Sequence, residues 1–377
     1  MTLSDLPTPA LVLDRGRLAA NCRRMLERCR ALGVKLRPHM KTLKAAEAAR
    51  LAIDPGHGGV AASTLNEAAY WAAQGYADIQ YAVCLTPEKF GRAARILEDA
   101  PQFSVFIDSL EVAQELLAYA RTNGLAFRAW VEIDCGGRRT GVSPDGPELL
   151  DIARTLSQGP LVFEGVATHA GQSYADVPVA AIADIAEQER AAVVRAAERI
   201  EAIGAPVPGC SAGSTPTALH ARSAEGLTEY RAGVYMAGDL FQAGIGSVDL
   251  DGIAVSVLAT VISRDAGSRR IVLDAGGLAL SKDRSTRALG GRDRGYGLVC
   301  DLEGRPRWGD LVVDDVHQEH GVIEAAPPEA FEALPIGARV RILPNHACMT
   351  AAAYDRYQVV DGGIDVVGEW GRTNGWG

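Results

Sequence analysis

The sequence predicts an α/β protein with two parts, a closed (β/α)8 barrel of the TIM type followed by an all-β domain. Short apolar runs alternate with amphipathic helical patterns through the first half of the chain, and the number of repeats is close to eight. The second half contains short strand-like runs separated by Gly, Pro and Asp. The 377 residues also exceed the usual size of a domain with one core.

The first half begins with the strand ALVLD, Ala10–Asp14. A helix follows over residues 15–33 and stops at Gly33. Further strands are expected at VKLRPHM, GVAAS, IQYAV, FSVFID, AFRAWVEID, FEGVATHA, GCSAGSTPT and YRAGVYMAGD. The helices between them are expected at Leu43–Ile53, Leu65–Gly75, Pro87–Asp99, Leu110–Gly124, Pro147–Leu156 and Pro178–Ile203. Because a helix follows each strand, consecutive strands should run parallel.

The second half is expected to form strands without a long helix between them. The strand-like runs are IAVSVLATVISR, RRIVLDAGG, GYGLVC, VIEAA, GARVRILP and YQVVDGG. The predicted domains are therefore the barrel over residues 1–245 and the β-domain over residues 246–377. The first strand, within residues 1–13, could belong with the β-domain instead.

Composition is that of an ordinary folded protein and argues against several partners. Apolar residues make up 47% of the chain and charged residues 23%. A net charge of −9 without a basic cluster argues against nucleic-acid binding. No apolar run is long enough to span a bilayer, and the N-terminus has no leader pattern. Seven cysteines without a CxxC pair predict free thiols in a reducing compartment, so we expect a cytoplasmic protein.

Polar and titratable side chains follow several of the predicted barrel strands, which is where catalytic residues of such barrels lie. Any one of them could be only a polar strand end, but the set points to a site at this rim. The candidates are His39, Lys41, Asp134, Arg138 or Arg139, His169, Tyr174, Ser214, Thr215, Gly233, Tyr235 and Asp239.

The stretch RPHMKTLK, Arg37–Lys44, contains a lysine suited to covalent chemistry. Lys41 lies at a strand end, where partial desolvation and neighbouring cations lower the pKa of an amine and suit it to a Schiff base. A capping salt bridge is the structural alternative. Lys44 falls inside the next predicted helix and should be solvated.

Two glycine turns follow late strands of the predicted barrel. GSTPT, Gly213–Thr217, offers backbone N–H groups and hydroxyls to an anion, although it also reads as an ordinary helix start. RAGVY provides a second glycine turn at the next strand end. Barrels of this type usually hold a phosphate at this place.

The stretch PNHACMT, Pro344–Thr350, carries a candidate metal-binding pair. His346 and Cys348 are two residues apart, so in an extended segment both side chains would point to one face. An imidazole and a thiolate suit Zn²⁺, and two ligands would leave positions open for water and substrate. A buried cysteine beside a hydrogen-bonded histidine is the alternative. Glu319 and His320 of QEHG could orient these ligands or form a polar turn.

Eight motifs occur in a familiar order: TPALVLD, RPHMKTLK, VAASTLNEA, VEIDCGGRRTGV, THAGQSY, GSTPT, QEHG and PNHACMT. They resemble the metal-activated D-serine dehydratase and D-threonine aldolase family over nearly the whole chain. RPHMK together with PNHAC is the most specific combination. The resemblance implies a pyridoxal 5'-phosphate enzyme built like alanine racemase, with fold type III, and a homodimer.

The resemblance also implies a role for each matching residue. Lys41 would bind the cofactor covalently, Arg139 would contact its ring hydroxyl, His169 would pack against its ring, Tyr174 would lie near its pyridine nitrogen, Ser214, Thr215, Gly233 and Val234 would hold its phosphate, and His346 and Cys348 would bind the metal. Zn²⁺ is the expected ion, with Mn²⁺ or another divalent cation as the alternative.

The implied activity is dehydration of a small D-3-hydroxy amino acid, with D-serine giving pyruvate and ammonia as the leading reaction. D-threo-3-hydroxyaspartate dehydratase and D-threonine aldolase are alternatives on the same scaffold. Cys348 favours the dehydratases, because the aldolases tend to carry aspartate there. Leu43 and Ala232, where many relatives have histidine and proline, leave the substrate open. The metal pair argues against a protein that binds the cofactor without turnover, and a racemase has no use for it.

Overall fold

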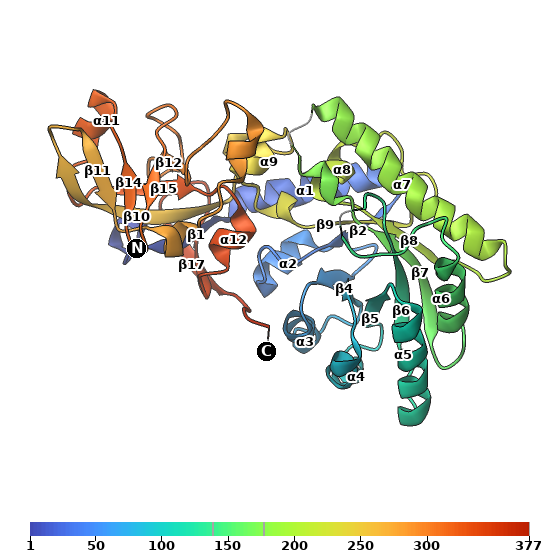
Figure 1. The fold of residues 1–377 in the computed structure, drawn as a ribbon. Coiled ribbons are helices and arrows are strands. Elements are labelled where there is room, and N and C mark those ends of the chain that lie inside the picture. Colours follow the sequence, from blue (N-terminus) through green and yellow to red (C-terminus); the bar gives the residue numbers. More distant parts are fainter. Residues whose placement is uncertain (138, 176–177, 377) are drawn as a thin grey trace. The chain divides into compact units, whose positions relative to one another are not determined.

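The computed structural model describes residues 1–137, 139–175 and 178–376, and the chain forms two compact units (Figure 1). We call them the barrel unit and the β unit. The barrel unit comprises Arg24–Lys41, Ala52–Gly233 and Asn374–Gly377. The β unit comprises Met1–Arg23, Thr42–Leu51 and Val234–Thr373.

The barrel unit contains one parallel sheet of eight strands in the order β2-β9-β8-β7-β6-β5-β4-β3. An isolated parallel bridge between His39 and Ala61 links the two ends of this order, so the barrel is nearly closed. This arrangement confirms the predicted (β/α)8 barrel. Its strands are β2 (Lys35–Pro38), β3 (Val60–Ala62), β4 (Ile79–Cys84), β5 (Ser104–Ile107), β6 (Arg128–Ile133), β7 (Val162–Thr168), β8 (Gly209–Ala212) and β9 (Glu229–Ala232).

Helices connect the strands of the barrel unit. They are α3 (Leu65–Ala73), η2 (Pro87–Lys89), α4 (Phe90–Asp99), α5 (Leu110–Asn123), α6 (Glu148–Leu156), η3 (Gly171–Ser173), α7 (Val179–Glu201) and α8 (Thr215–His220). Local sequence sets their ends. Ser109 caps α5 by accepting the N–H of Val112, and Gly124 ends that helix with a left-handed φ of 63°. Figure 1 shows α4–α7 outside the strands they connect.

Helices α1 (Arg15–Ala31) and α2 (Ala46–Ala52) precede this series. The prediction that Lys44 lies inside the second helix was wrong, because Lys44 has a φ of 51° in the turn before α2. Backbone carbonyls of this turn accept other donors instead of helical N–H groups. Leu43 accepts the hydroxyl of Tyr357 at 3.0 Å, and Lys44 accepts the N–H of Thr373 at 2.9 Å.

The β unit contains a mostly antiparallel sheet in the order β13-β14-β11-β10-β1-β16-β17, with β15 paired to β10 and β12 paired to β15. Strand β1 pairs antiparallel with β10 and parallel with β16. The strands are β1 (Ala10–Asp14), β10 (Val255–Asp265), β11 (Arg270–Leu273), β12 (Leu298–Cys300), β13 (Asp315–Val316), β14 (Gly321–Ile323), β15 (Arg339–Leu343), β16 (Arg356–Val360) and β17 (Val366–Gly371). This sheet confirms the predicted β-rich second part.

Short helical segments punctuate the β unit: η1 (Leu3–Asp5), η4 (Val234–Met236), α9 (Leu240–Gly244), η5 (Leu250–Gly252), α10 (Gly277–Leu280), η6 (Ser285–Leu289), α11 (Pro328–Ala333) and α12 (Ala347–Ala351). An apolar cluster of Leu3, Leu6, Val12, Leu258 and Val360 joins the first residues to β10 and β16. Burying each such aliphatic side chain contributes about 1.5–3 kcal/mol to the stability of the fold.

All seven cysteines are free thiols. None of the described helices combines the length and apolarity needed to span a bilayer.

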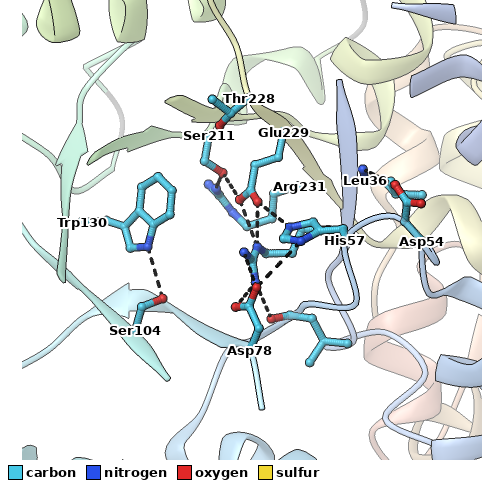
Figure 2. Close-up of polar contacts among 12 residues, drawn as sticks. Leu36, Asp54, His57, Asp78, Ser104, Trp130, Ser211, Thr228, Glu229 and Arg231 are labelled. Carbon is cyan, nitrogen blue, oxygen red and sulfur yellow. Dashed lines mark hydrogen bonds and ion pairs between the residues drawn. The ribbon is translucent and has the colours of Figure 1, made fainter. Parts of the chain in front are cut away.

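A network of buried and partly buried polar side chains lies around the N-terminal ends of barrel strands, and we call it the floor cluster (Figure 2). It consists of Arg37, His57, Asp78 and Glu229. The Nε of Arg37 lies 3.0 Å from both carboxylate oxygens of Glu229, and its Nη1 lies 2.7 Å from Asp78. The Nε2 of His57 lies 2.7 Å from Glu229. A Cβ on Gly59 would lie 2.4 Å from the Arg37 guanidinium, so glycine leaves the room this side chain needs.

Candidate functional site

Basic side chains gather at the C-terminal rim of the barrel. His39 follows β2, two residues before Lys41. Burial lowers the pKa of His39 well below its ordinary value, and the charges of Lys41, Arg231, His169 and Arg139 lower it further. Its Nδ1 is buried and has no hydrogen-bond partner among the described residues. The His39 ring is therefore neutral at pH 7 and stands among cations.

His169 directly follows β7, and a backbone hydrogen bond fixes the orientation of its ring. Its Nδ1 is 2.9 Å from the carbonyl oxygen of Gly213, so Nδ1 carries the proton and donates it. Burial, then the charges of Lys41 and Arg139, lower the pKa of His169 to about 3. The ring centroids of His169 and Tyr174 are 6.1 Å apart at an interplanar angle of 32°. A flat neutral face thus borders the rim.

The turn predicted to bind phosphate starts helix α8. The Oγ of Ser214 accepts the N–H of Thr217 at 3.2 Å, and Thr217 Oγ1 accepts the N–H of Ser214 at 2.9 Å. The N–H of Thr215 donates to the hydroxyl of Tyr174 at 3.4 Å. Tyr174 was expected near the pyridine nitrogen, and in the structure its hydroxyl lies on this turn. Ser214 and Thr215 are buried, so their polar groups are shielded from water and bond to neighbours such as Ser173 and Thr217.

The second glycine turn follows β9 and lies against β2. A Cβ on Gly233 would lie 2.5 Å from the carbonyl oxygen of His39, so only glycine permits this approach. Val234 follows as the first residue of η4. Arg231, two residues before Gly233, donates to Ser211 Oγ at 2.6 Å and to the carbonyl of Thr168 at 2.9 Å. The sequence analysis did not include Arg231 among the site residues, although its position on a late barrel strand could have indicated a place near the rim.

Arg139 lies on an exposed loop after β6, and Arg138 lies outside the described residues. Two carboxylates at neighbouring strand ends hold this loop. Glu132 accepts the hydroxyl of Thr140 at 2.8 Å, and Asp108 accepts the N–H of Gly141 at 3.1 Å. Both carboxylates stand at the ends of predicted strands, and that position could have identified them.

Among the described residues, Cys84, Asp108 and Glu132 form a group whose metal-capable atoms lie within 4.8 Å of one another. Their hydrogen bonds account for this proximity. The thiol of Cys84 donates to Glu132 at 2.9 Å, and the same carboxylate oxygen accepts Thr140. Burial, then the charge of Glu132, raises the pKa of the Cys84 thiol far above its ordinary value. The hydrogen bond from this thiol to Glu132 accounts for the group without requiring a metal.

These rim residues fit pyridoxal 5'-phosphate. Lysine, two arginines and neutral histidines form a cationic surrounding, and the cofactor is anionic at its phosphate and ring oxygen. The hydroxyls and N–H groups of the α8 turn add donors of the kind that bind phosphate.

The candidate metal residues of the β unit lie at the start of α12. The expectation that His346 and Cys348 share an extended segment was wrong. His346 is the residue before the helix, with φ −139° and ψ 103°, and Cys348 lies in the first helical turn. The chain turns here because Asp239 accepts the N–H of Ala347 at 3.0 Å. The two side chains remain neighbours, since the Cys348 thiol is one of the groups that raise the pKa of His346.

Carboxylates surround this pair. His346 Nδ1 lies 3.1 Å from Asp283 Oδ2, and Cys348 Sγ lies 3.1 Å from the hydroxyl of Thr42. Burial disfavours a charged His346, but hydrogen bonds to Asp283 and Cys348 outweigh it and raise its pKa to about 11. The His346 contact lowers the pKa of Asp283 to about 2, and burial raises that of Asp239 to about 6.

This donor set fits a divalent metal. An imidazole and a sulfur lie side by side, and a metal ion can replace the proton that the metal-free pair holds. Sequence reasoning missed Asp283, because 63 residues separate it from His346. The QEHG segment forms a turn instead, in which Gln318 donates to Glu319 at 3.2 Å and the N–H of His317 donates to the His320 carbonyl.

Comparison with known proteins identifies both parts of the chain. Residues 13–240 match the alanine racemase N-terminal domain, and residues 254–360 match the putative serine dehydratase domain. A D-threo-3-hydroxyaspartate dehydratase from Delftia sp. strain HT23 is 44% identical over 100% of this chain and 99% of its own. A D-serine dehydratase from Dictyostelium discoideum is 28% identical over 99% of this chain and 98% of its own.

A solved structure shows the same fold along the whole chain. It is a cysteine-to-alanine variant of D-threo-3-hydroxyaspartate dehydratase in a metal-free form, with a TM-score of 0.95 and 43% identity over 100% of both chains. The similarity therefore includes both the barrel and the segment that carries His346 and Cys348.

Proposed function

The chain belongs to the D-serine dehydratase and D-threonine aldolase family of alanine-racemase-like lyases, and we propose that it dehydrates a D-3-hydroxy amino acid. The observation that carries this proposal is the His346–Cys348 pair with Asp283 behind the imidazole. A metal site is superfluous for racemisation and for cofactor storage, whereas a Lewis acid assists loss of a β-hydroxyl, because hydroxide is a poor leaving group.

The substrate we favour is D-threo-3-hydroxyaspartate, with D-serine second. This order reverses that of the sequence analysis. Its support is the 44% identity to a D-threo-3-hydroxyaspartate dehydratase, against 28% to a D-serine dehydratase, both over nearly the whole chain. Cys348, rather than aspartate, continues to favour dehydration over the aldolase alternative.

The fold family depends on pyridoxal 5'-phosphate, which when bound supplies an electron sink for negative charge at the substrate Cα. Lys41 would bind the cofactor through its amine and then take the α-proton as a general base. The hydroxyls and N–H groups of Ser214 and Thr215 would bind the phosphate, together with the backbone of Gly233 and Val234.

Three further side chains would orient the cofactor ring. Arg139 would donate to its oxygen, His169 would present its neutral ring to the cofactor face, and Tyr174 would contribute its hydroxyl near the α8 turn. The pKa of His169, lowered to about 3, makes its ring a weak base, which suits a lyase that moves one α-proton rather than a racemase.

His346 and Cys348 would hold the metal, which would supply Lewis-acid assistance for departure of the β-hydroxyl. We propose Zn²⁺, because a thiolate and an imidazole are its usual ligands, with Mn²⁺ or another divalent cation as the alternative. We also propose a homodimer on the basis of the family resemblance. The cytoplasmic location stays a prediction.

The test is a product assay with purified protein loaded with pyridoxal 5'-phosphate and Zn²⁺. D-threo-3-hydroxyaspartate should give oxaloacetate and ammonia, and D-serine should give pyruvate and ammonia more slowly. The L-enantiomers serve as controls and should be inert. Release of glycine and acetaldehyde from D-threonine, without any 2-oxo acid from the other two substrates, would instead establish the aldolase.

A further inference from the structure

His346 is held by a carboxylate from a distant part of the β unit. Its Nδ1 faces Asp283 Oδ2 at 3.1 Å across 63 residues of sequence. A hydrogen bond of this kind places the proton of a neutral imidazole on Nδ1 and leaves the lone pair on Nε2. Carboxylates in this position behind metal-bound histidines fix both the tautomer and the ring orientation.

We propose that Asp283 is the positioning residue of the metal site, which makes Nε2 of His346 the atom that binds the metal. The inference rests on the metal site of the proposed function. Asp283 would contact neither substrate nor cofactor. It would act only by fixing the orientation of the His346 ring.

The two carboxylate oxygens of Asp283 have different hydrogen-bond partners. Oδ1 accepts the N–H of Ser285 at 2.7 Å, which anchors the carboxylate to its own loop, and Oδ2 alone faces His346. The N–H of Asp283 donates to Ser281 Oγ at 3.2 Å and fixes the loop from the other side. The carboxylate is therefore aimed before any metal binds.

A second contact aligns the same two segments. Asn345, the residue before His346, accepts the N–H of Thr286 at 3.2 Å and donates to the carbonyl of Gly295 at 2.8 Å. The Asp283 loop and the His346 turn are thus joined at two successive positions. Asp239 acts differently, because its oxygens accept the backbone N–H groups of Gln242 and Ala347 and shape the turn rather than the ring.

Asp283→Asn separates positioning from folding. The amide oxygen of asparagine can still accept the Ser285 N–H, so the loop keeps its anchor, while the anionic acceptor opposite His346 is lost. Asp293→Asn is a matched control. Asp293 also accepts the N–H two residues on, from Gly295 at 3.0 Å, and its other oxygen binds Arg284 at 2.6 Å instead of a histidine.

The experiment measures the Zn²⁺ dissociation constant of the cofactor-loaded enzyme by competition with a chromophoric chelator. The Asp283→Asn variant should bind Zn²⁺ about 10–100-fold more weakly than the unchanged protein, and Asp293→Asn should match the unchanged protein. Each variant loses one partly exposed ion pair, so the thermal midpoint of the metal-free form should fall by a similar small amount in both. Equal Zn²⁺ affinity in Asp283→Asn and Asp293→Asn would overturn the inference.

Two more variants separate this inference from the proposed function. His346→Ala and Cys348→Ala should each abolish tight Zn²⁺ binding. If neither does, the metal site itself is misassigned, and the role of Asp283 falls with it. If both do while Asp283→Asn binds normally, only the role of Asp283 is wrong. Should Asp283→Asn not fold, Asp283→Ser carries the same test, because a serine hydroxyl can also accept the Ser285 N–H.

Discussion

The floor and the rim of the barrel both hold buried or half-buried polar groups, but they balance charge in opposite ways. In the floor cluster, Arg37 lies between Asp78 and Glu229, so each charge meets its opposite (Figure 2). At the rim, Lys41, Arg231 and Arg139 lie close enough to His39 to lower its pKa, and the carboxylates of Glu132 and Asp108 bind the neighbouring loop instead. In the floor cluster opposite charges are paired, whereas the basic groups of the rim are suited to an anionic ligand.

The pKa shifts follow this difference. Burial would raise the pKa of Glu229, but the charge of Arg37 and the hydrogen bond from His57 hold it far below its ordinary value. For His39, burial and neighbouring charge act in the same direction. Ion pairs in which opposite charges stabilise each other usually contribute to folding. Buried groups whose charged forms are destabilised by their neighbours are typical of functional sites. We therefore expect floor variants to lose stability and rim variants to lose chemistry.

The largest expected effect is at the rim. Lys41→Ala removes the amine that binds the cofactor and the general base, so turnover should fall at least about a thousandfold. The visible absorbance of the lysine-bound cofactor should disappear, while the thermal midpoint of the apoprotein stays the same. Lys44→Ala is the control and should keep both absorbance and turnover. Persistence of the absorbance in Lys41→Ala would show that another lysine binds the cofactor.

At the floor we expect the converse. Arg37→Met leaves the buried carboxylate of Glu229 and the partly exposed carboxylate of Asp78 without their guanidinium, which should lower the free energy of unfolding by about 3–5 kcal/mol in urea titrations. The kcat of the remaining folded enzyme should change less than about twofold.

The control for the floor is Arg154→Met, which breaks an exposed ion pair with Asp151 in the same unit. It should change the free energy of unfolding by about 1 kcal/mol or less. A similar loss in both variants would mean that burial of the floor cluster adds nothing. A loss of kcat without a loss of stability in Arg37→Met would assign the floor to catalysis.

Local signals were enough to predict the barrel and to suggest candidate residues at its rim. Strand β1 occupies the predicted Ala10–Asp14, and the observed end of α5 at Gly124 follows from the left-handed conformation that glycine favours. Lys41, His169 and Ser214 were predicted as site residues because parallel barrel strands carry their polar ends to one rim. The positions of the strands and of their ends can be read from hydrophobic periodicity and from turn residues.

Long-range contacts account for what could not be predicted. The turn at His346 depends on Asp239, 108 residues away from the N–H it accepts, so spacing alone suggested an extended segment. Asp283 and the floor cluster have no local signature, because a charged residue in a loop or a short strand reads as solvent-exposed. Only the tertiary fold brings these groups to their partners.

A smaller effect should appear in the pH dependence of stability. The pKa of His39 is well below that of an unfolded histidine, about 6.5, so below that pH the unfolded state binds a proton that the folded state does not. Stability must then fall with falling pH, by about 1.4 kcal/mol per pH unit from this residue. His39→Gln should remove that slope from urea titrations of the cofactor-free protein between about pH 6 and pH 4. Parallel slopes for the two proteins would contradict a neutral, buried His39.

The smallest expected effect that distinguishes the rim from the floor is on cofactor affinity, and it comes from the loop of Arg139. Thr140 donates to Glu132 at 2.8 Å, and Thr140→Val removes this hydrogen bond while keeping the side-chain shape. A hydrogen bond of this kind contributes about 1 kcal/mol. If the loop serves the cofactor, the dissociation constant for pyridoxal 5'-phosphate should rise about fivefold. The free energy of unfolding of the apoprotein should stay within about 0.5 kcal/mol, because the loop is exposed.

The reverse result, lower stability with unchanged cofactor affinity, would make the Glu132–Thr140 contact structural like those of the floor. Thr122→Val is the matched control, because its hydroxyl donates to a helical carbonyl of α5 at 2.9 Å, away from the rim. It should leave cofactor affinity unchanged. Hydrogen bonds whose loss weakens cofactor binding would then define the rim, and the Glu132 carboxylate behind the loop would belong to it.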